Sequence, residues 1–244
     1  MAKVVHMQEL SVVIPTFNER DNIQTLVPAV LAVFADHDID GEIVVVDDNS
    51  NDGTIAVVRA LEREHSAVHL LLREGPASLS RAWLEGFEAA SKANIVCIDA
   101  DLCHDPKLFP LMLERLNSCD VVIGSRYLAD ATSGEGKSIA AKLASKLGQY
   151  ANRIFLGMSE TDSSHSFRMF RKSVFDAIKG QMRSEGNVFL IEFLLRAKRN
   201  GAGVSEVPIV YGERTYGETK LRVGKESLRY LRFLFKSVLM GQRA

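Results

Sequence analysis

The chain has 244 residues, a length that is enough for the core of one α/β domain or two small ones. Its composition, 46% apolar and 25% charged, excludes a disordered or collagen-like protein. No apolar run reaches the roughly 18 residues of a membrane span, and three cysteines without zinc-type spacing favour a reducing, cytoplasmic setting. The net charge is −1, but the charge is unevenly distributed, because residues 221–244 carry six basic side chains and one acidic one. An acidic body with a basic C-terminal segment argues against general nucleic-acid binding.

Short β-branched runs alternate with helical stretches through the first half of the chain. The predicted strands are 10–14, 42–46, 68–72, 94–98 and 120–123, and the predicted helices are 19–34, 53–64, 79–92 and 106–116. Continuous apolar strands separated by helices are typical of a parallel sheet that is covered on both faces. The predicted fold class is therefore α/β, with a mostly parallel, open, doubly wound (Rossmann-like) sheet flanked by helices.

The second half is less regular. A Gly-, Ser- and Thr-rich loop over 125–137 leads to a helix over 138–156, a polar turn with a short strand in 163–170, a helix over 188–199, a strand over 204–211 and a Gly-rich loop over 212–224. No internal repeat or low-complexity linker interrupts the chain. We therefore predict one domain over 1–224, followed by a C-terminal helix over 225–244 that is not a separate domain.

The triplet Asp99-Ala100-Asp101 directly follows the apolar run 95–98. Ligands of open parallel sheets bind beyond the carboxyl ends of the strands. Two carboxylates at such an end suit Mg²⁺ or Mn²⁺, cations that bridge the phosphates of a nucleotide. An acidic turn that caps the next helix is the alternative, with Asp105 before Pro106 as the N-cap. The residues alone leave both interpretations open.

A second acidic cluster lies after the run 44–46. Asp47 and Asp48 end this strand, and Asp52 follows shortly before a predicted helix. A carboxylate at the end of a sheet can accept hydrogen bonds from a base or ribose, so we expect Asp47 and Asp48 to contact a nucleoside. For Asp52 the favoured interpretation is an Asx turn that caps the helix.

Six blocks of sequence carry a resemblance to a known family. They are Pro15-Thr16-Phe17-Asn18-Glu19-Arg20, Val46-Asp47-Asp48-Asn49-Ser50-Asn51-Asp52-Gly53-Thr54, Asp99-Ala100-Asp101-Leu102, Gly124-Ser125-Arg126-Tyr127, Asp162 with Phe167-Arg168, and Glu206-Val207-Pro208-Ile209 with Arg214 and Gly217-Glu218-Thr219-Lys220-Leu221. In this order they resemble family 2 glycosyltransferases of the GT-A fold, and within that family the dolichol-phosphate (polyprenol-phosphate) mannosyltransferases.

The resemblance implies an enzyme that transfers a sugar, typically mannose from GDP-mannose, to a polyprenyl phosphate with inversion at the anomeric carbon. It also implies a divalent cation, Mg²⁺ or Mn²⁺, on the diphosphate. The residues that would hold the donor and the metal are Pro15, Phe17, Glu19, Val46, Asp47, Asp48, Asp99, Ala100, Asp101, Arg126, Arg214 and Lys220. In this set Asp99 and Asp101 would bind the metal, and the three basic residues would grip phosphates.

The residues expected to take direct part in the reaction are Asp101, Arg126, Asp162 and Arg168. Departure of a nucleoside diphosphate develops negative charge, which cations stabilise. A phosphate monoester acceptor is already an anion and needs no general base. It must still approach an electronegative site, and Arg126 with Arg168 would lessen that repulsion. Asp162 would orient Arg168, act as the base for a hydroxyl acceptor, or cap a turn.

Two departures from the family pattern widen the choice of function. Cys103 stands where relatives often have Gln or Ser, and because a thiolate suits Mg²⁺ poorly we expect Cys103 to pack nearby. Residues 144–152 offer Gln149 and Lys146 where relatives tend to have Arg and Ser for the acceptor phosphate. One alternative is a soluble family 2 enzyme that uses another donor, such as UDP-glucose, or a hydroxyl acceptor. The other is a non-catalytic subunit that binds nucleotide sugars.

The C-terminal segment has the pattern of a basic amphipathic helix. Its basic residues Lys225, Arg229, Arg232 and Lys236 recur at spacings of four, three and four. Such a helix can lie on an anionic membrane surface, or it can pack its apolar side on the core or on a second subunit. We therefore expect a cytoplasmic protein that reaches the cytoplasmic face of a membrane through this helix, directly or through a small membrane-protein partner.

Overall fold

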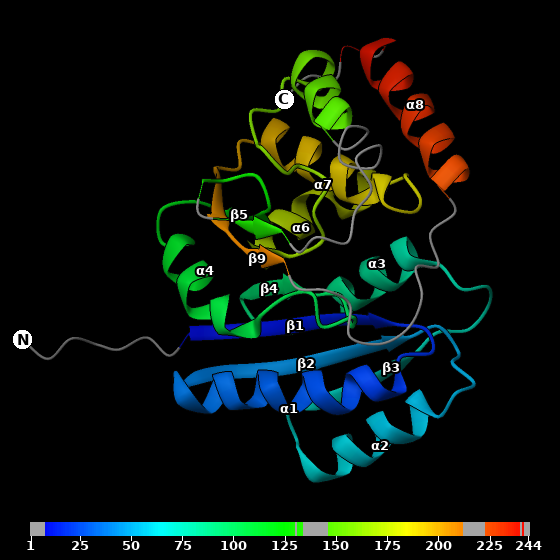
Figure 1. Cartoon of the computed structure of the whole chain (residues 1–244), viewed down its shortest axis with the longest axis vertical. Coiled ribbons are helices and arrows are strands. Elements are labelled where there is room, and N and C mark those ends of the chain that lie inside the picture. Colours follow the sequence, from blue (N-terminus) through cyan, green and yellow to red (C-terminus); the bar gives the residue numbers. More distant parts are fainter. Residues whose placement is uncertain (1–7, 130, 134–145, 212–222, 240, 242–244) are drawn as a thin grey trace, which may run out of the picture.

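A seven-stranded sheet runs through the centre of the computed structural model (Figure 1), which describes residues 8–129, 131–133, 146–211, 223–239 and 241. In spatial order its strands are β3 (Val68–Leu72), β2 (Ile39–Asp47), β1 (Gln8–Thr16), β4 (Asn94–Cys97), β7 (Arg168–Arg171), β5 (Val121–Ser125) and β8 (Val204–Pro208). All neighbours are parallel except β7, which is antiparallel to both β4 and β5. The prediction of a mostly parallel α/β sheet is confirmed.

Helices cover both faces of this sheet. One face is covered by α1 (Arg20–Asp36), α2 (Thr54–Glu64) and α4 (Phe109–Arg115), the last preceded by the 3₁₀ turn η1 (Pro106–Leu108); the other is covered by α3 (Leu79–Ala89), α6 (Lys172–Ile178) and α7 (Val188–Arg199). Alternate residues of a strand point to opposite faces, so Val12 joins the core under α1 while Val13 joins the core under α3. Two apolar cores therefore fix the strands from both sides.

The second half departs in detail from the predicted elements. The short strand expected in 163–170 is β7, and it lies inside the sheet. The strand expected over 204–211 divides at Ile209, whose backbone N–H donates to Ser125 O (3.1 Å), and continues as β9 (Val210–Tyr211), which pairs with β6 (Thr132–Ser133). The helix α6 and the 3₁₀ turn η3 (Lys179–Gln181) were not predicted. Most of the Gly-rich loop lies outside the described residues.

The helix predicted over 138–156 is described from residue 146 onward. It is α-helical to 151 and then π-helical as η2 (Asn152–Leu156), ending at Gly157 in the left-handed region with φ 73°. We call residues 146–156 the linker helix. It packs against the C-terminal helix α8 (Val223–Leu239), which lies at the opposite end of the molecule from α2 (Figure 1).

The C-terminal helix divides its apolar residues between the protein and the surface. Leu234 is buried and Tyr230 half-buried against the linker helix and α7, whereas Leu231, Phe235 and Leu239 are 61%, 69% and 70% exposed. The helix thus packs on the core and still presents an apolar strip. None of the helices that the structure describes is long and apolar enough to cross a bilayer.

Candidate active site

The candidate site lies at the carboxyl ends of the central strands. From β1 the chain builds outward to β2 and β3, and it then returns to place β4 on the other side of β1. Loops after β1 and β4 therefore diverge and leave a crevice where ligands of open α/β sheets bind. Because β7 is antiparallel, its first residue, Arg168, lies at this same edge, opposite Cys97 and Ile123.

Asp47 lies inside the turn after β2 and not on the surface of the crevice. Its carboxylate accepts hydrogen bonds from the Thr16 hydroxyl (2.9 Å) and from the backbone N–H and hydroxyl of Ser50 (both 2.7 Å), and the residue is fully buried. These three donors engage both oxygens. The expectation that Asp47 contacts a nucleoside is not supported by this geometry, which assigns Asp47 to holding the turn.

Asp48 is directed to the other side of the same turn. It forms an ion pair with Arg73 and accepts a hydrogen bond from the backbone N–H of Ser78 (2.8 Å). Burial raises the pKa of Asp48, and the bonds from Ser78 and Arg73 oppose this rise. Arg73, which also pairs with Glu85 (3.1 Å), is a site-forming residue that the sequence analysis did not single out. Asp48 and Arg73 thus form a buried ion pair at the carboxyl ends of β2 and β3.

The loop after β1 interlocks with the loop after β2. Asn18 has φ of 55°; its backbone N–H donates to the Ser50 hydroxyl (2.7 Å), and its side chain accepts from Asn51 N (3.0 Å). Pro15 and Val46 are buried beneath these loops, whereas Phe17 is 38% exposed. Phe17 is thus a partly exposed apolar side chain of these loops.

Two further residues of these loops have local roles. The Glu19 carboxylate accepts a hydrogen bond from the Asn22 amide (2.6 Å). Asp52 accepts hydrogen bonds from the backbone N–H (2.9 Å) and hydroxyl (2.5 Å) of Thr54, so the predicted Asx turn is present, one residue before the N-cap Gly53 of α2. The backbone N–H of Arg20 also donates to Asp52 (3.2 Å) and joins the two loops.

Asp99 and Asp101 follow β4 in a tight turn. Ser166 Oγ donates to Asp99 Oδ2 (2.6 Å), and the backbone N–H of Cys103 donates to Asp101 Oδ1 (3.1 Å). Leu102 has φ of 63°, a left-handed conformation that costs a branched residue energy and is concentrated at functional sites. Ala100 and Cys103 are buried beneath the turn, so Cys103 packs as expected.

This donor set fits a hard divalent cation. Asp99 and Asp101 supply carboxylate oxygens, and the described part of the chain holds no group of three or more His, Cys, Asp and Glu side chains arranged to bind a metal. Mg²⁺ in proteins is often bound by one or two carboxylates together with substrate phosphates and water. The two carboxylates match that mode and not an all-protein metal cage.

Arg126 and Asp162 form the central ion pair of the site. The Nε and Nη2 atoms of Arg126 donate to the two oxygens of Asp162 (2.7 and 2.8 Å), and its backbone N–H donates to the same carboxylate (3.2 Å). Asp162 is completely buried, whereas the Arg126 side chain retains 13% exposure. This bidentate geometry fixes the plane of the guanidinium at the edge of the crevice. Asp162 therefore orients Arg126, and the expectation that it orients Arg168 is wrong.

A turn over residues 161–166 connects the two parts of the site. Glu206 of β8 accepts hydrogen bonds from Thr161 N (2.9 Å), Thr161 Oγ1 (2.9 Å) and Asp162 N (3.0 Å). At its other end Ser166 contacts Asp99. The sequence predicted no role for Ser166, and it offered Glu206 only within one of the six blocks that carry the family resemblance. Both were missed because their partners are distant in sequence.

Arg168 does not face the crevice. It is fully buried, and its guanidinium donates to the carbonyl oxygens of His165 (3.0 Å), Leu190 (2.8 Å) and Ser163 (3.2 Å). Burial lowers its pKa to about 10, so it remains charged at neutral pH. The expectation that Arg168 approaches an acceptor phosphate is corrected by this geometry: Arg168 braces the 161–166 turn, because a buried cation must satisfy its donors within the protein.

Two histidines join the acidic turn to the 161–166 turn: His104 follows the acidic turn, and His165 belongs to the 161–166 turn. His104 stacks on Phe167 and meets the ring of His165 edge-on, with centroids 5.0 Å apart in both cases. Burial lowers the pKa of His104, an effect that Asp99 and Asp101 oppose. Arg214 and Lys220, the other two predicted phosphate ligands, lie outside the described residues.

The sequence matches the family model described as glycosyl transferase family 2 over residues 11–179. It is 30% identical over 229 residues to a dolichol-phosphate mannosyltransferase of Mycosarcoma maydis, covering 92% of this chain and 77% of that protein. A dolichol-phosphate mannosyltransferase of Pyrococcus furiosus is 35% identical over 93% of this chain, which spans 63% of that longer protein. An undecaprenyl-phosphate mannosyltransferase of Micrococcus luteus is 32% identical, with 87% of each chain covered.

Solved structures show the same fold. The glucosyl-3-phosphoglycerate synthase of Mycobacterium tuberculosis, in a crystal structure with Mn²⁺, uridine diphosphate and phosphoglyceric acid, superposes with a TM-score of 0.69 at 17% identity and covers 96% of this chain and 78% of its own. A match at that identity concerns the fold alone. Together with the family match over more than half of the sequence, it leads to one conclusion: the chain belongs to glycosyl transferase family 2 and is a glycosyltransferase of the GT-A fold.

Proposed function

We propose that this glycosyltransferase moves mannose from GDP-mannose to a polyprenyl phosphate, with inversion at the anomeric carbon. The observation that carries the proposal is the ion pair of Arg126 with the buried Asp162 at the edge of the crevice that holds Asp99 and Asp101. A cation fixed in this way suits an anionic acceptor that must approach an anionic donor. The relatives from three organisms, each named for a polyprenol-phosphate acceptor, support the same assignment.

In the proposed reaction a phosphate oxygen of the acceptor bonds to C1 of the mannose. The bond from C1 to the β-phosphate oxygen breaks, and GDP leaves with the electron pair. The acceptor is an anion, so no side chain has to remove a proton. Both oxygens of Asp162 are engaged by Arg126, which argues against Asp162 as the general base of a hydroxyl acceptor.

The protein contributes position and charge to this reaction. Asp99 and Asp101 would hold a divalent cation, which when bound offsets the charge that develops on the leaving diphosphate. The nucleoside would lie between the Asp48–Arg73 ion pair and the exposed ring of Phe17. Arg126 would face the acceptor phosphate, and Arg214 and Lys220 would grip the donor phosphates.

The C-terminal helix α8 would bring the enzyme to its lipid substrate. The exposed strip of Leu231, Phe235 and Leu239 has the basic side chains of Arg232 and Lys236 beside it, both exposed. An apolar strip inserted at the headgroup level, flanked by basic residues, is the pattern of a helix that lies on an anionic membrane surface. The cytoplasmic face of the membrane is where we propose that the enzyme acts.

Product formation provides the test. The purified protein is incubated with GDP-mannose, Mg²⁺ or Mn²⁺ and a short-chain polyprenyl phosphate, and lipid-linked mannose is measured; UDP-glucose and a lipid-free reaction are run in parallel. We expect mannose transfer that chelation abolishes, and its loss in Asp101→Asn. Asp105→Asn is the matched control, because it alters an exposed carboxylate of the same loop and keeps an N-cap for Lys107. Transfer to a lipid-free acceptor only, or full activity of Asp101→Asn, would contradict the proposal.

A further inference from the structure

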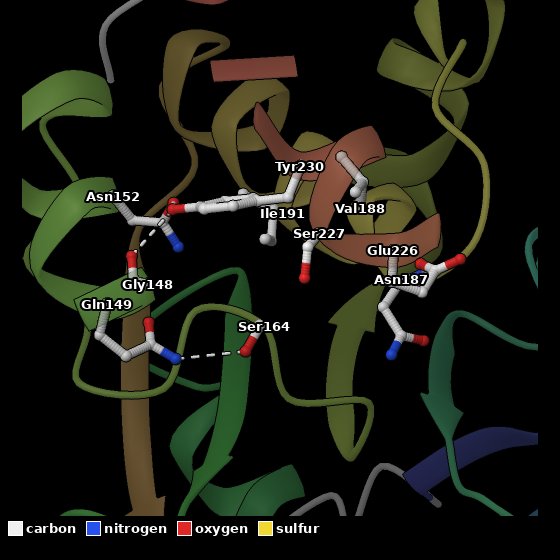
Figure 2. Close-up of a pocket in the computed structure, with 10 residues that line it drawn as sticks. All are labelled: Gly148, Gln149, Asn152, Ser164, Asn187, Val188, Ile191, Glu226, Ser227 and Tyr230. Atoms are coloured by element: carbon white, nitrogen blue, oxygen red, sulfur yellow. Dashed lines mark hydrogen bonds between the residues drawn. The ribbon is translucent and has the colours of Figure 1, made fainter. Parts of the chain in front are cut away.

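The C-terminal helix is hydrogen-bonded to the linker helix at one tyrosine. Tyr230 Oη donates to Asn152 Oδ1 (2.7 Å) and lies 2.9 Å from Gly148 O (Figure 2). The phenol is sheltered between the two helices, where burial raises its pKa to about 12. It therefore stays protonated and can serve as a donor over the whole physiological range of pH.

The same linker helix contacts the turn that holds Asp162. Asn152 Nδ2 donates to Ser163 Oγ (2.8 Å), and Ser163 donates to Gln149 Oε1 from its hydroxyl (2.7 Å) and its backbone N–H (3.2 Å). Gln149 Nε2 in turn lies 3.3 Å from Asp162 Oδ1 and 3.2 Å from Ser164 Oγ. A continuous set of hydrogen bonds thus runs from α8 to the carboxylate that orients Arg126.

The packing around Gln149 leaves its position dependent on these bonds. Gln149, Asn152, Ser164 and Tyr230 line a cavity of about 220 Å³ between the linker helix, α7 and α8. Figure 2 shows their side chains around this open space, with the Gln149 amide directed to Ser164. On the side that borders the cavity, the Gln149 side chain is not held by packing. Its hydrogen bonds therefore contribute to the position of the amide, and we expect the amide to shift when one of them is lost.

We propose that Gln149 and Tyr230 are positioning residues for the transfer reaction. They connect the packing of α8 on the linker helix to the position of the Arg126 guanidinium. The inference rests on the proposed function, in which Arg126 faces the acceptor phosphate. The apolar strip of α8 is directed outward while Tyr230 is directed inward. A force on α8, such as its contact with a lipid surface, is thereby transmitted to Asp162. The enzyme would be most active when α8 is packed on the linker helix.

The first test uses substitutions that remove one hydrogen-bonding group each and keep the shape. In Tyr230→Phe and Gln149→Met we expect the KM for polyprenyl phosphate to rise about fivefold to tenfold, with the KM for GDP-mannose unchanged. The double variant should show no more than the effect of the stronger single one, because both act on the same set of bonds. The matched controls are Tyr150→Phe, an exposed tyrosine of the linker helix, and Gln181→Met, a glutamine that contacts Arg196.

A second measurement does not depend on the substrate. Hydrogen–deuterium exchange of the backbone N–H groups of Arg126 and Asp162, which bond to Asp162 and Glu206, should be faster in both variants and unchanged in the controls. Unaltered exchange, an unchanged acceptor KM, or an equal rise in both KM values would overturn the proposal. If wild type fails to use polyprenyl phosphate while the exchange still responds, the proposed function fails and the connection from α8 to Arg126 stands.

Discussion

The candidate site has two halves: the turns of Asp47, Asp48 and Asp52, which we call the donor side after their proposed role, and Arg126 with the 161–166 turn, which we call the acceptor side. The two halves are held together in different ways. On the donor side, Asp47 accepts hydrogen bonds from Ser50, three positions later, and from Thr16 at the end of β1. Asp52 accepts a hydrogen bond from Thr54, two positions later.

On the acceptor side, Asp162 is held by Arg126, 36 residues earlier, and its turn by Glu206, 44 residues later. The donor side thus combines bonds within turns with bonds between the neighbouring loops, such as that of Asn18 with Ser50, whereas the Asp162 carboxylate is held by Arg126 and Gln149 from other elements. Since Gln149 belongs to the linker helix, which packs on α8, the acceptor side is the part that we propose responds to α8.

The strongest test of this comparison removes the cation of the acceptor side. Arg126→Ala should lower kcat/KM for polyprenyl phosphate by about 10²–10³-fold, because a preorganised donor to a reacting anion is worth that much. The KM for GDP-mannose should change little, since the donor side is built separately. Arg126→Lys keeps the charge without the bidentate geometry and is expected to fall in between. An equal loss for donor and acceptor would show that the two sides are not independent.

On the donor side, Asp47→Ala should act on stability first. The change leaves the two buried Ser50 donors without their acceptor and the Thr16 hydroxyl with only Val46 O, at a cost of about 3 kcal/mol in the free energy of unfolding. Chemical denaturation measures this loss. Asp52→Ala, which removes a more exposed cap, should cost about 1 kcal/mol. A larger loss for Asp52→Ala would contradict the assignment of Asp47 as the residue that holds the turn.

The packing of α3 on the strands of the donor side gives a smaller effect. Gly86 faces β1 and β2 so closely that an added Cβ would overlap the side chains of Val13 and Val46. Gly86→Ala is therefore expected to destabilise the protein by about 1–3 kcal/mol, seen as a lower denaturation midpoint. Gly180→Ala is the control, because nothing lies within 4 Å of its Cβ position. Equal stability of the two variants would mean that α3 can move away from the sheet without cost.

The smallest expected effect concerns the surface next to the acceptor side. Phe235→Glu replaces an exposed side chain of α8 and should leave the unfolding free energy unchanged, while binding to vesicles that contain phosphatidylglycerol weakens about tenfold. Vesicle cosedimentation measures this binding. Leu72→Glu, at an exposed leucine of β3 on the donor side, should have no such effect. Equal loss in both variants would show that net charge, and not the α8 strip, governs binding.

The sequence by itself determined the α/β class, the strands and helices of the first half, the acidic turns at the strand ends and the family. Strand runs, helical spacing and Asx turns such as that of Asp52 depend on residues within a few positions of one another, so a single segment carries the information. The same reasoning located Asp99 and Asp101, since every parallel strand of the sheet ends at one edge.

Only the tertiary structure decided which partners the polar residues take. It placed β7 antiparallel inside the sheet, turned Arg168 into the core, closed Asp47 within its turn and gave Asp162 to Arg126. It also let α8 pack on the linker helix through Tyr230 and keep its apolar strip exposed, where the sequence left these as alternatives. The physical reason is that a buried charge must find its partners wherever the fold supplies them, and some of those partners, such as Leu190 for Arg168 and Arg126 for Asp162, lie tens of residues away.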